Sequence, residues 1–229
     1  MNRPRPESPW STPQMVAGFA TSAPNATLTA FAAAELRRGG GSAVDIGCGA
    51  ARNTLPLAQM GWTVMGIDSS PPMLDAAAER LRAAGVADRV TLHLGPMRAI
   101  PLAAASVDLI VAHGIWNLAR SGNEFRAAVR EAARVARPDA ALFVFTFSRH
   151  TLPGSAAPVP GETFVFTQFS GEPQCFLTAS ELVAELGAAG FTPEPAVPFR
   201  EHNRPRPGAL SAGGPVIYEG AFRFAATPG

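Results

Sequence analysis

The feature that most constrains the fold is the alternation of short apolar segments with segments of helical spacing. Between residues 42 and 148, strand-like apolar runs follow one another in the order SAVDIG, WTVMGID, RVTLHLG, SVDLIVAHG and ALFVFTFS. Helical patterns precede and separate most of these runs. Strands that are joined by crossover helices pair in parallel, and such units are right-handed. The alternation therefore predicts an α/β fold with a doubly wound, mostly parallel sheet.

The helical segments are bounded by proline, glycine and capping residues. A first pattern breaks at Pro24 and resumes as TLTAFAAAELRR, and the later ones are PPMLDAAAERLRAAG, GNEFRAAVREAARVARP and TASELVAELGAAG. Pro138 is predicted to end the helix GNEFRAAVREAARVARP. Thr178 or Ser180 is predicted to open the last helix through a capping box. In ARNTLPLAQMG, Pro56 predicts either a kink or a helix that starts later.

The last third of the chain has a different pattern. Residues 150–178 hold several prolines and glycines around one strand-like piece, ETFVFTQF, and are predicted to form a substrate-side insertion. FTPEPAV and YEGAFRFA are predicted as closing strands, joined by the loop REHNRPRPG. The expected sheet is Rossmann-like, with seven strands, an antiparallel C-terminal strand and helices on both faces. We expect a single domain over residues 1–229, with a flexible tail at 1–13.

Composition excludes several classes of protein. The net charge of +1 gives no basic excess for gripping phosphates, so we expect no nucleic-acid partner. The basic side chains are all Arg, which excludes Schiff-base chemistry and a lysine base. Cys48 and Cys175 predict neither a disulfide framework nor a metal site. No apolar run suits a signal peptide or a membrane span, so we expect a cytoplasmic monomer or homodimer.

The segment VDIGCGAARN lies between a strand and a helix, where open α/β sheets bind their ligands. Gly47 and Gly49 allow a sharp turn and a close approach of a ligand to the backbone. The following strand ends in Asp68, and a carboxylate at such a position accepts hydrogen bonds from ribose hydroxyls. These features predict a site for a cofactor that contains a nucleoside.

Two further positions separate the possible cofactors. A dinucleotide site needs a third glycine beside the pyrophosphate, and Arg52 stands at that position. Asp45 precedes the two glycines, where a carboxylate repels a pyrophosphate and suits an ammonium group. A ligand with ribose hydroxyls, an ammonium group and no phosphate is S-adenosylmethionine. The spacing therefore favours S-adenosylmethionine over a nicotinamide cofactor.

Through these residues the chain resembles the class I S-adenosylmethionine-dependent methyltransferases, over about residues 43–148. The stretch DIGCGAARNTLPLAQMGWTVMGIDSSPPML is similar to the tellurite- and thiopurine-type branch, in which GCG-x-x-RN begins the first helix. The resemblance implies transfer of a methyl group to a small-molecule S, Se, Te, N or O nucleophile. Such in-line transfer mainly requires that the protein holds the acceptor and excludes water.

The resemblance also implies which residues bind the cofactor. Asp45 and the loop after it would line the amino-acid end, and Asp68 would hold the ribose. Ser69 and Met73 would flank the adenosine. The full predicted set is Asp45, Gly47, Cys48, Gly49, Ala50, Arg52, Asn53, Asp68, Ser69, Met73, Pro96, Met97 and His113.

Three members of this set have weaker support from their residue types. Arg52 lies in the first turn of a helix, where a cation is unfavourable unless an anion such as the cofactor carboxylate compensates it. A solvated Arg52 and a purely structural Asn53 stay open as alternatives. Many family members have an acidic residue after the third strand, whereas this chain has Gly95-Pro96-Met97 there, so Met97 is expected to pack on the adenine.

Histidines at two strand ends are the candidate catalytic bases. His113 ends the fourth strand and His150 follows the fifth, both on the ligand side of the sheet. An imidazole exchanges protons near neutral pH and suits this role. A His113 that lines the cofactor without titrating stays open as an alternative, because a soft acceptor needs no base.

The predicted acceptor-binding residues are Trp116, Asn117, Arg149 and Phe169. The Phe-rich segment FVFTQFSGEPQCFL is expected to form a wall or a cover of the acceptor pocket, with a structural hairpin as the alternative. Arg200, Arg204 and Arg206 are read as a solvated loop, unless an anionic substrate uses them.

Three other functions stay open on the sequence. A nicotinamide-dependent Rossmann oxidoreductase would have to accommodate a pyrophosphate beside Arg52. A non-catalytic S-adenosylmethionine-binding protein would bind the cofactor without turnover. A nucleic-acid methyltransferase is disfavoured, because the chain has HGIWN after the fourth strand in place of an NPPY-like motif.

Overall fold

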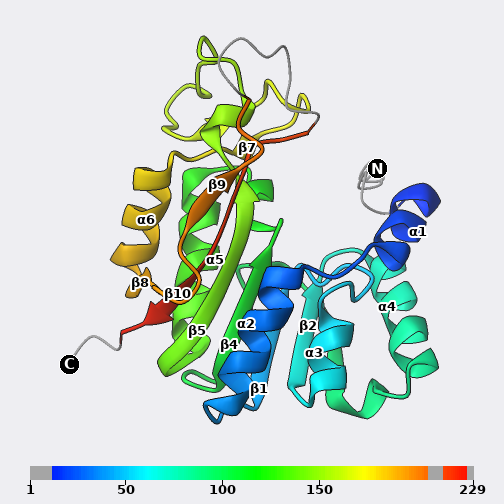
Figure 1. The fold of residues 1–229 in the computed structure, drawn as a ribbon. Helices are drawn as coiled ribbons and strands as arrows, with labels where there is room; N and C mark the ends of the chain where they lie inside the picture. Colours follow the sequence, from blue (N-terminus) through cyan, green and yellow to red (C-terminus); the bar gives the residue numbers. More distant parts are fainter. Residues whose placement is uncertain (1–11, 206–213, 226–229) are drawn as a thin grey trace. The chain divides into compact units, whose positions relative to one another are not determined.

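The computed structural model describes residues 12–205 and 214–225. It divides into two compact units, Met1–Pro96 and Met97–Gly229 (Figure 1). Most of the predicted N-terminal tail lies outside the described residues. Its last two residues belong to a helix, because Thr12 caps and Pro13 begins α1 (Pro13–Thr21).

The first unit contains three parallel strands, as the apolar runs predict. They are β1 (Ser42–Ile46), β2 (Thr63–Asp68) and β3 (Val90–Leu94). The strand β2 pairs in parallel with both β1 and β3. Asp45 is aligned with Gly66, and Asp68 is aligned with Leu94. The loop after β1 and the end of β2 are therefore brought to the same edge of these strands.

The helices of the first unit begin and end at the expected signals. They are α1, α2 (Ala26–Arg37), α3 (Thr54–Met60), α4 (Pro71–Ala83) and the short 3₁₀ turn η2 (Ala87–Arg89). Pro56 neither kinks nor breaks α3, because the helix starts at Thr54 and its first turn needs no backbone donor from Pro56. Gly61 ends α3 in the left-handed conformation, with φ at 113°.

The second unit holds the remaining strands of the sheet. They are β4 (Val107–His113), β5 (Ala136–Phe147), β8 (Phe191–Pro193), β9 (Arg200–His202) and β10 (Ile217–Phe224). The strands β4 and β5 are parallel, and β10 runs antiparallel to β5, β8 and β9. Figure 1 shows β4, β5 and β10 as its longest strands. The strand β9 corrects the prediction of a plain loop at REHNRPRPG, because backbone pairing with β10 overrides its polar composition.

The helices of the second unit are α5 (Gly122–Val135) and α6 (Ala179–Ala188), with 3₁₀ turns η3 (Trp116–Leu118) and η4 (Arg149–Thr151). The predicted capping box is present, with Thr178 and Glu181 exchanging hydrogen bonds. The prediction that Pro138 ends α5 is wrong. The helix ends at Val135, and Pro138 lies near the start of β5, where its neighbours are exposed.

The segment 150–178 is mostly irregular. Its only strands among the described residues are β6 (Val165–Phe166) and β7 (Gln174–Cys175), which pair antiparallel. The strand predicted over ETFVFTQF is therefore reduced to two residues. Side-chain packing replaces backbone pairing here, because Leu152, Phe166 and Phe176 form a buried cluster.

The strand directions confirm the predicted Rossmann-like, mostly parallel sheet with an antiparallel C-terminal strand. Within the part of the chain that the structure describes, this sheet has eight strands, the short β9 being added to the seven predicted. Across the same residues, no helix combines the length and the apolar character needed to span a membrane. A single domain over residues 1–229 stays a prediction.

The packing of β10 generates a stability prediction at Gly220. A Cβ built on Gly220 would lie 2.5 Å from the Cα of Phe199. Overpacking against backbone costs about 1–3 kcal/mol, so Gly220→Ala should lower the free energy of unfolding in urea by that amount. Gly187 in α6 is the matched control, because a Cβ there meets nothing within 4 Å. Gly187→Ala should be neutral or stabilising by roughly 0.5–1 kcal/mol. Equal stabilities of the two variants would contradict this packing.

Candidate functional site

Asp68, the last residue of β2, organises the loop that follows β1. The Gly49 amide donates to Asp68 Oδ2 at 2.9 Å, and the Ser70 amide donates to Oδ1 at 2.8 Å. Burial raises the pKa of Asp68, while the amides of Ser70 and Gly49 oppose this shift. The carboxylate therefore points along the sheet edge toward the glycine loop, and does not point into the apolar core.

The glycine loop has a backbone that favours glycine. Gly47 and Gly49 adopt positive φ angles of 73° and 52°. The amides of Gly47 and Cys48 donate to the carbonyl of Ile67 at 2.7 and 3.0 Å, so the loop is tied to the end of β2. A Cβ on Gly49 would meet Met73 Sδ at 3.9 Å, which places the predicted adenosine neighbour beside the loop. Phe19 Cδ1 would lie at the same distance of 3.9 Å, so side chains of α1 and α4 border this turn.

Asp45 is a buried acid beneath the loop. It is 2% exposed, and Thr54 Oγ1 donates to its Oδ2 at 2.6 Å. Burial raises the pKa of Asp45 from 3.8 to about 6, and the charge of Asp68 adds to the shift. The Thr54 hydrogen bond and the charge of Arg52 act in the opposite direction. A cation bound near Asp45 would stabilise its ionised form.

The other predicted cofactor residues in the first unit lie around the same loop. Burial lowers the pKa of Arg52, and the charge of Asp45 opposes that shift, so the two side chains lie near one another. Asn53 Oδ1 accepts a hydrogen bond from the Asn25 amide at 3.1 Å, which fits the structural alternative for Asn53. Cys48 and Ala50 are buried, and burial raises the pKa of the Cys48 thiol well above its ordinary value. Cys48 is therefore a packing residue and not a thiolate.

The remaining members of the set differ in exposure. Ser69 and Pro96 are exposed, Met97 is half-buried and Met73 is buried. In the second unit, His113 ends β4 and stacks on Phe145, with the ring centroids 4.2 Å apart and the planes at 9°. This stacking fixes the plane of the His113 imidazole.

Trp116 and Asn117, two predicted acceptor residues, lie in η3 and are almost fully buried. Within the described residues, neither Trp116 Nε1 nor Asn117 Oδ1 has a hydrogen-bond partner, and the same holds for Gln174 Oε1 in β7. The strand β7 packs against η3. A buried polar atom without a partner costs about 1–3 kcal/mol. These atoms are therefore candidates for contact with a ligand, and sequence reasoning missed Gln174 because nothing in its local pattern marks it.

Arg149 and Phe169 differ in their surroundings. The Arg149 guanidinium lies 4.6 Å from the centroid of the Phe166 ring and donates to the Ala156 carbonyl at 2.8 Å. Arg149 thus holds the segment 150–178 together. Phe169 is 46% exposed and packs edge-on against Phe147. An exposed aromatic ring in this segment is available to a small ligand.

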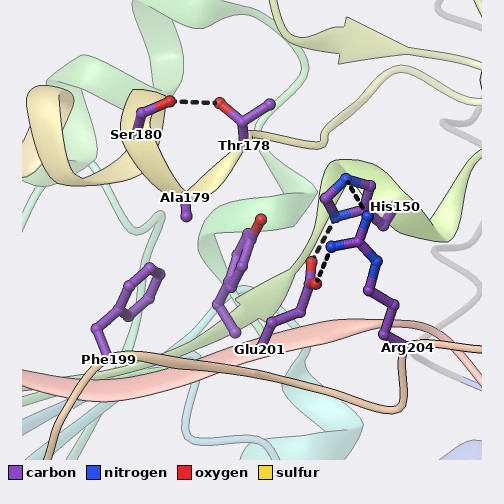
Figure 2. A pocket seen from close by; sticks show the side chains of 8 residues that line it. His150, Thr178, Ala179, Ser180, Phe199, Glu201 and Arg204 are labelled. Carbon is purple, nitrogen blue, oxygen red and sulfur yellow. Dashed lines mark hydrogen bonds and ion pairs between the residues drawn. The ribbon is translucent and has the colours of Figure 1, made fainter.

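His150 lies in a pocket that sequence reasoning did not assemble. Glu201 and Tyr218 line this pocket beside His150, and they come from β9 and β10 (Figure 2). No sequence motif links these positions to His150, because only the pairing of β9 with β10 brings them together. Among the residues described, no group of three His, Cys, Asp or Glu side chains is arranged to hold a metal ion.

The comparison with known families gives the class of the central segment. Residues 44–144 match the family model of the methyltransferase domain. The match covers less than half of the chain, and the matched residues include the glycine loop and Asp68.

Two curated relatives are methyltransferases of quinone biosynthesis by name. The ubiquinone biosynthesis O-methyltransferase of Azorhizobium caulinodans is 30% identical over 65% of this chain and 57% of that protein. The demethylmenaquinone methyltransferase of Corynebacterium efficiens is 32% identical over 50% of this chain and 45% of that protein. The chain thus spans about half the length of these relatives.

Solved structures share the fold at low sequence identity. The [4+2]-cyclase SpnF has a TM-score of 0.66 at 20% identity, over 87% of this chain and 81% of that chain. The 1,6-didemethyltoxoflavin-N1-methyltransferase of Burkholderia thailandensis, solved with S-adenosylhomocysteine bound, has a TM-score of 0.62 at 20% identity. That match covers 88% of this chain and 79% of the Burkholderia chain. These likenesses establish the fold, and a fold alone does not fix an activity.

The buried Asp45 generates a prediction on pH and stability. An unfolded Asp45 ionises near 3.8, whereas the folded one ionises near 6. The stability that Asp45 contributes is therefore full below about pH 4 and is lost as the pH rises to about 6, by about 3 kcal/mol. Asp45→Asn should remove this loss. The free energy of unfolding in urea, measured for the variant and the native chain between pH 4 and 7, tests this. Asp75→Asn, at an exposed position, is the control. If the difference in unfolding free energy between Asp45→Asn and the native chain does not change with pH, the raised pKa of Asp45 is contradicted.

Proposed function

We propose that the chain is an S-adenosylmethionine-dependent methyltransferase that methylates a small molecule. The observation that carries this proposal is the hydrogen bond from the Gly49 amide to Asp68, which places a carboxylate beside the glycine turn. In α/β sheets this arrangement receives a ribose. The match of residues 44–144 to the methyltransferase domain supports the same assignment.

The charges around the loop favour a phosphate-free cofactor. Asp45 and Asp68 are both carboxylates, and each raises the energy of a nearby anion. A pyrophosphate would have to approach these two acids, whereas the ammonium and sulfonium groups of S-adenosylmethionine are attracted by them. Arg52, whose charge favours the ionised form of Asp45, is proposed to contact the cofactor carboxylate. The alternative of a nicotinamide-dependent oxidoreductase is therefore disfavoured.

We propose the following roles for the residues around the loop. Asp68 binds the ribose, Asp45 and Arg52 bind the amino-acid end, and Met73 packs beside the adenosine. Met97 contacts the adenine, and His113 lines the cofactor. The other proposed cofactor contacts are Gly47, Cys48, Gly49, Ala50, Asn53, Ser69 and Pro96. When bound, S-adenosylmethionine supplies an electrophilic methyl group.

The acceptor is proposed to be held by residues of the second unit. Trp116 and Asn117 offer a buried donor and acceptor, and Gln174 adds a further acceptor. Arg149 and Phe169 shape the segment 150–178, which excludes water from the reaction. The name of one curated relative, the ubiquinone biosynthesis O-methyltransferase, supports an oxygen nucleophile. Membership of the tellurite- and thiopurine-type branch, with a sulfur, selenium or tellurium nucleophile, stays a prediction.

The proposal also covers the domain organisation, the location and the partners of the chain. The chain acts as one domain over residues 1–229, with residues 150–178 on the acceptor side. It works in the cytoplasm as a monomer or homodimer, with no nucleic-acid or membrane partner. A cofactor-binding protein without catalysis is the second possibility, and it would bind the cofactor but methylate no member of a broad acceptor panel.

Binding of S-adenosylhomocysteine tests the cofactor assignment. We expect saturable binding in calorimetry, no comparable binding of NAD(H) or NADP(H), and about tenfold weaker binding by Asp68→Asn, because a charged hydrogen-bond acceptor is lost. Asp75→Asn is the matched control, since Asp75 is an exposed residue of the neighbouring helix α4. If S-adenosylhomocysteine does not bind at millimolar concentration, or binds Asp68→Asn as tightly as the native chain, the assignment is wrong.

A further inference from the structure

A separate cavity of about 420 Å³ lies within the second unit. It is bordered by the turn after β5, the first turn of α6, the strand β9 and the start of β10 (Figure 2). Its lining residues are His150, Thr178, Ala179, Ser180, Phe199, Glu201, Arg204 and Tyr218. The cofactor proposal above uses none of these residues.

One wall of the cavity is an acid paired with an imidazole. His150 Nδ1 lies 2.6 Å from Glu201 Oε1, and Ser148 Oγ donates to the same oxygen at 2.5 Å. A carboxylate only accepts hydrogen bonds, so the hydrogen of a neutral His150 is on Nδ1. Nε2 therefore carries the lone pair and is the basic atom of the ring. Figure 2 shows the imidazole held between Glu201 and Arg204.

Arg204 provides the positive charge beside this lone pair. Its guanidinium lies 3.4 Å from His150 Nε2 and 3.3 Å from Glu201 Oε2. The Arg204 side chain is 60% exposed, so a ligand can replace its contact with Nε2 at small cost. An anion formed next to Nε2 would lie beside Arg204.

Two aromatic residues also line the cavity. Phe199 is half-buried and Tyr218 is 2% exposed, so Phe199 offers the larger open ring surface. The rings of Phe199 and Tyr218 pack against one another with centroids 4.9 Å apart and planes at 34°. Ala179 adds a methyl group at the first turn of α6. Flat aromatic walls bind flat rings, because such pairs gain from both buried area and ring electrostatics. The cavity thus combines a surface for a planar ring with one basic nitrogen and one guanidinium.

The charges that face His150 suit a ligand that arrives neutral. Glu201 and Arg204 cancel in net charge, and Ser148 and Tyr218 contribute only hydroxyl groups. Burial raises the pKa of Glu201, but hydrogen bonds from Ser148 and His150 outweigh it and hold that pKa below its ordinary value. Glu201 therefore stays a carboxylate. A ligand that is already a carboxylate has no acidic hydrogen to donate to Nε2, whereas an un-ionised hydroxyl has one.

From this geometry we infer that the cavity binds a planar aromatic compound with an acidic hydroxyl group, which transfers its proton to His150 Nε2. The O–H bond breaks and an N–H bond forms. The resulting phenolate lies beside the Arg204 guanidinium, and the imidazolium is stabilised by the Glu201 carboxylate. Glu201 acts through His150 and is a positioning residue.

The probe for this site is 4-nitrophenol, whose anion absorbs visible light and whose neutral form does not. At a pH below the pKa of the free probe, adding the protein should increase the anion absorbance in a saturable manner. 4-Nitroanisole has the same ring without the acidic hydrogen, and it should bind about tenfold more weakly, because it neither donates to Nε2 nor becomes an anion. 4-Nitrobenzoate should also bind weakly, since it arrives as a carboxylate.

Variants separate the proposed chemistry from a purely structural network. His150→Asn should abolish the absorbance increase, and Glu201→Gln and Arg204→Gln should each weaken it about tenfold. His202→Asn and Arg200→Gln are matched controls, because both residues are exposed in β9 and do not line the cavity. An unchanged absorbance in His150→Asn overturns the inference. So does a Glu201→Gln variant whose melting temperature falls while its absorbance change remains native.

Binding of S-adenosylhomocysteine by the same variants keeps the two proposals distinguishable. The variants should retain it, which also shows that they are folded. If the native chain binds S-adenosylhomocysteine but does not ionise 4-nitrophenol, the inference about the cavity is wrong and the cofactor assignment stands. If the probe is ionised but S-adenosylhomocysteine does not bind, the cavity site stands and the methyltransferase proposal fails.

Discussion

The Asp68 carboxylate is the interaction on which the candidate cofactor site depends. It accepts hydrogen bonds from the amides of Gly49 and Ser70, and so joins the glycine loop after β1 to the start of α4. Without these bonds the loop would have to satisfy its amides elsewhere, because buried backbone donors are rarely left without a partner. The same carboxylate is negative at the position where we propose that a ribose binds. One side chain thus shapes the turn and sets its charge.

The second constraint is the burial of charge beneath the loop. Asp45 is 2% exposed, and this burial disfavours its ionised form in the folded chain although Thr54 Oγ1 donates a hydrogen bond to it. A bound ammonium group would reverse this, since an opposite charge nearby favours ionisation. The first unit therefore holds a buried acid whose ionised form is stabilised when a cation binds nearby. The match to the methyltransferase domain is consistent with a cofactor that carries such a cation.

Much of the fold was predictable because its signals are local. The apolar runs mark β1 to β5, Gly61 ends α3, and Thr178 with Glu181 caps α6. The errors have physical reasons. Pro138 was read as a helix end because proline lacks a donor, yet α5 ends at Val135 and the chain continues directly into β5. The strand β9 has a polar, Arg-rich sequence and forms because β10 offers it an open edge.

The sequence by itself determined the order of the elements, the glycine turn after β1 and the acid at the end of β2, because each depends on residues that are neighbours in the chain. Tertiary structure alone decided that Asp68 bonds to Gly49, that Trp116, Asn117 and Gln174 bury polar atoms together, and that His150 meets Glu201. These contacts join residues far apart in the chain, such as His150 and Glu201 at a separation of 51 positions. No local pattern encodes such a contact, because it forms only when the strands that carry the residues have found their places in the sheet.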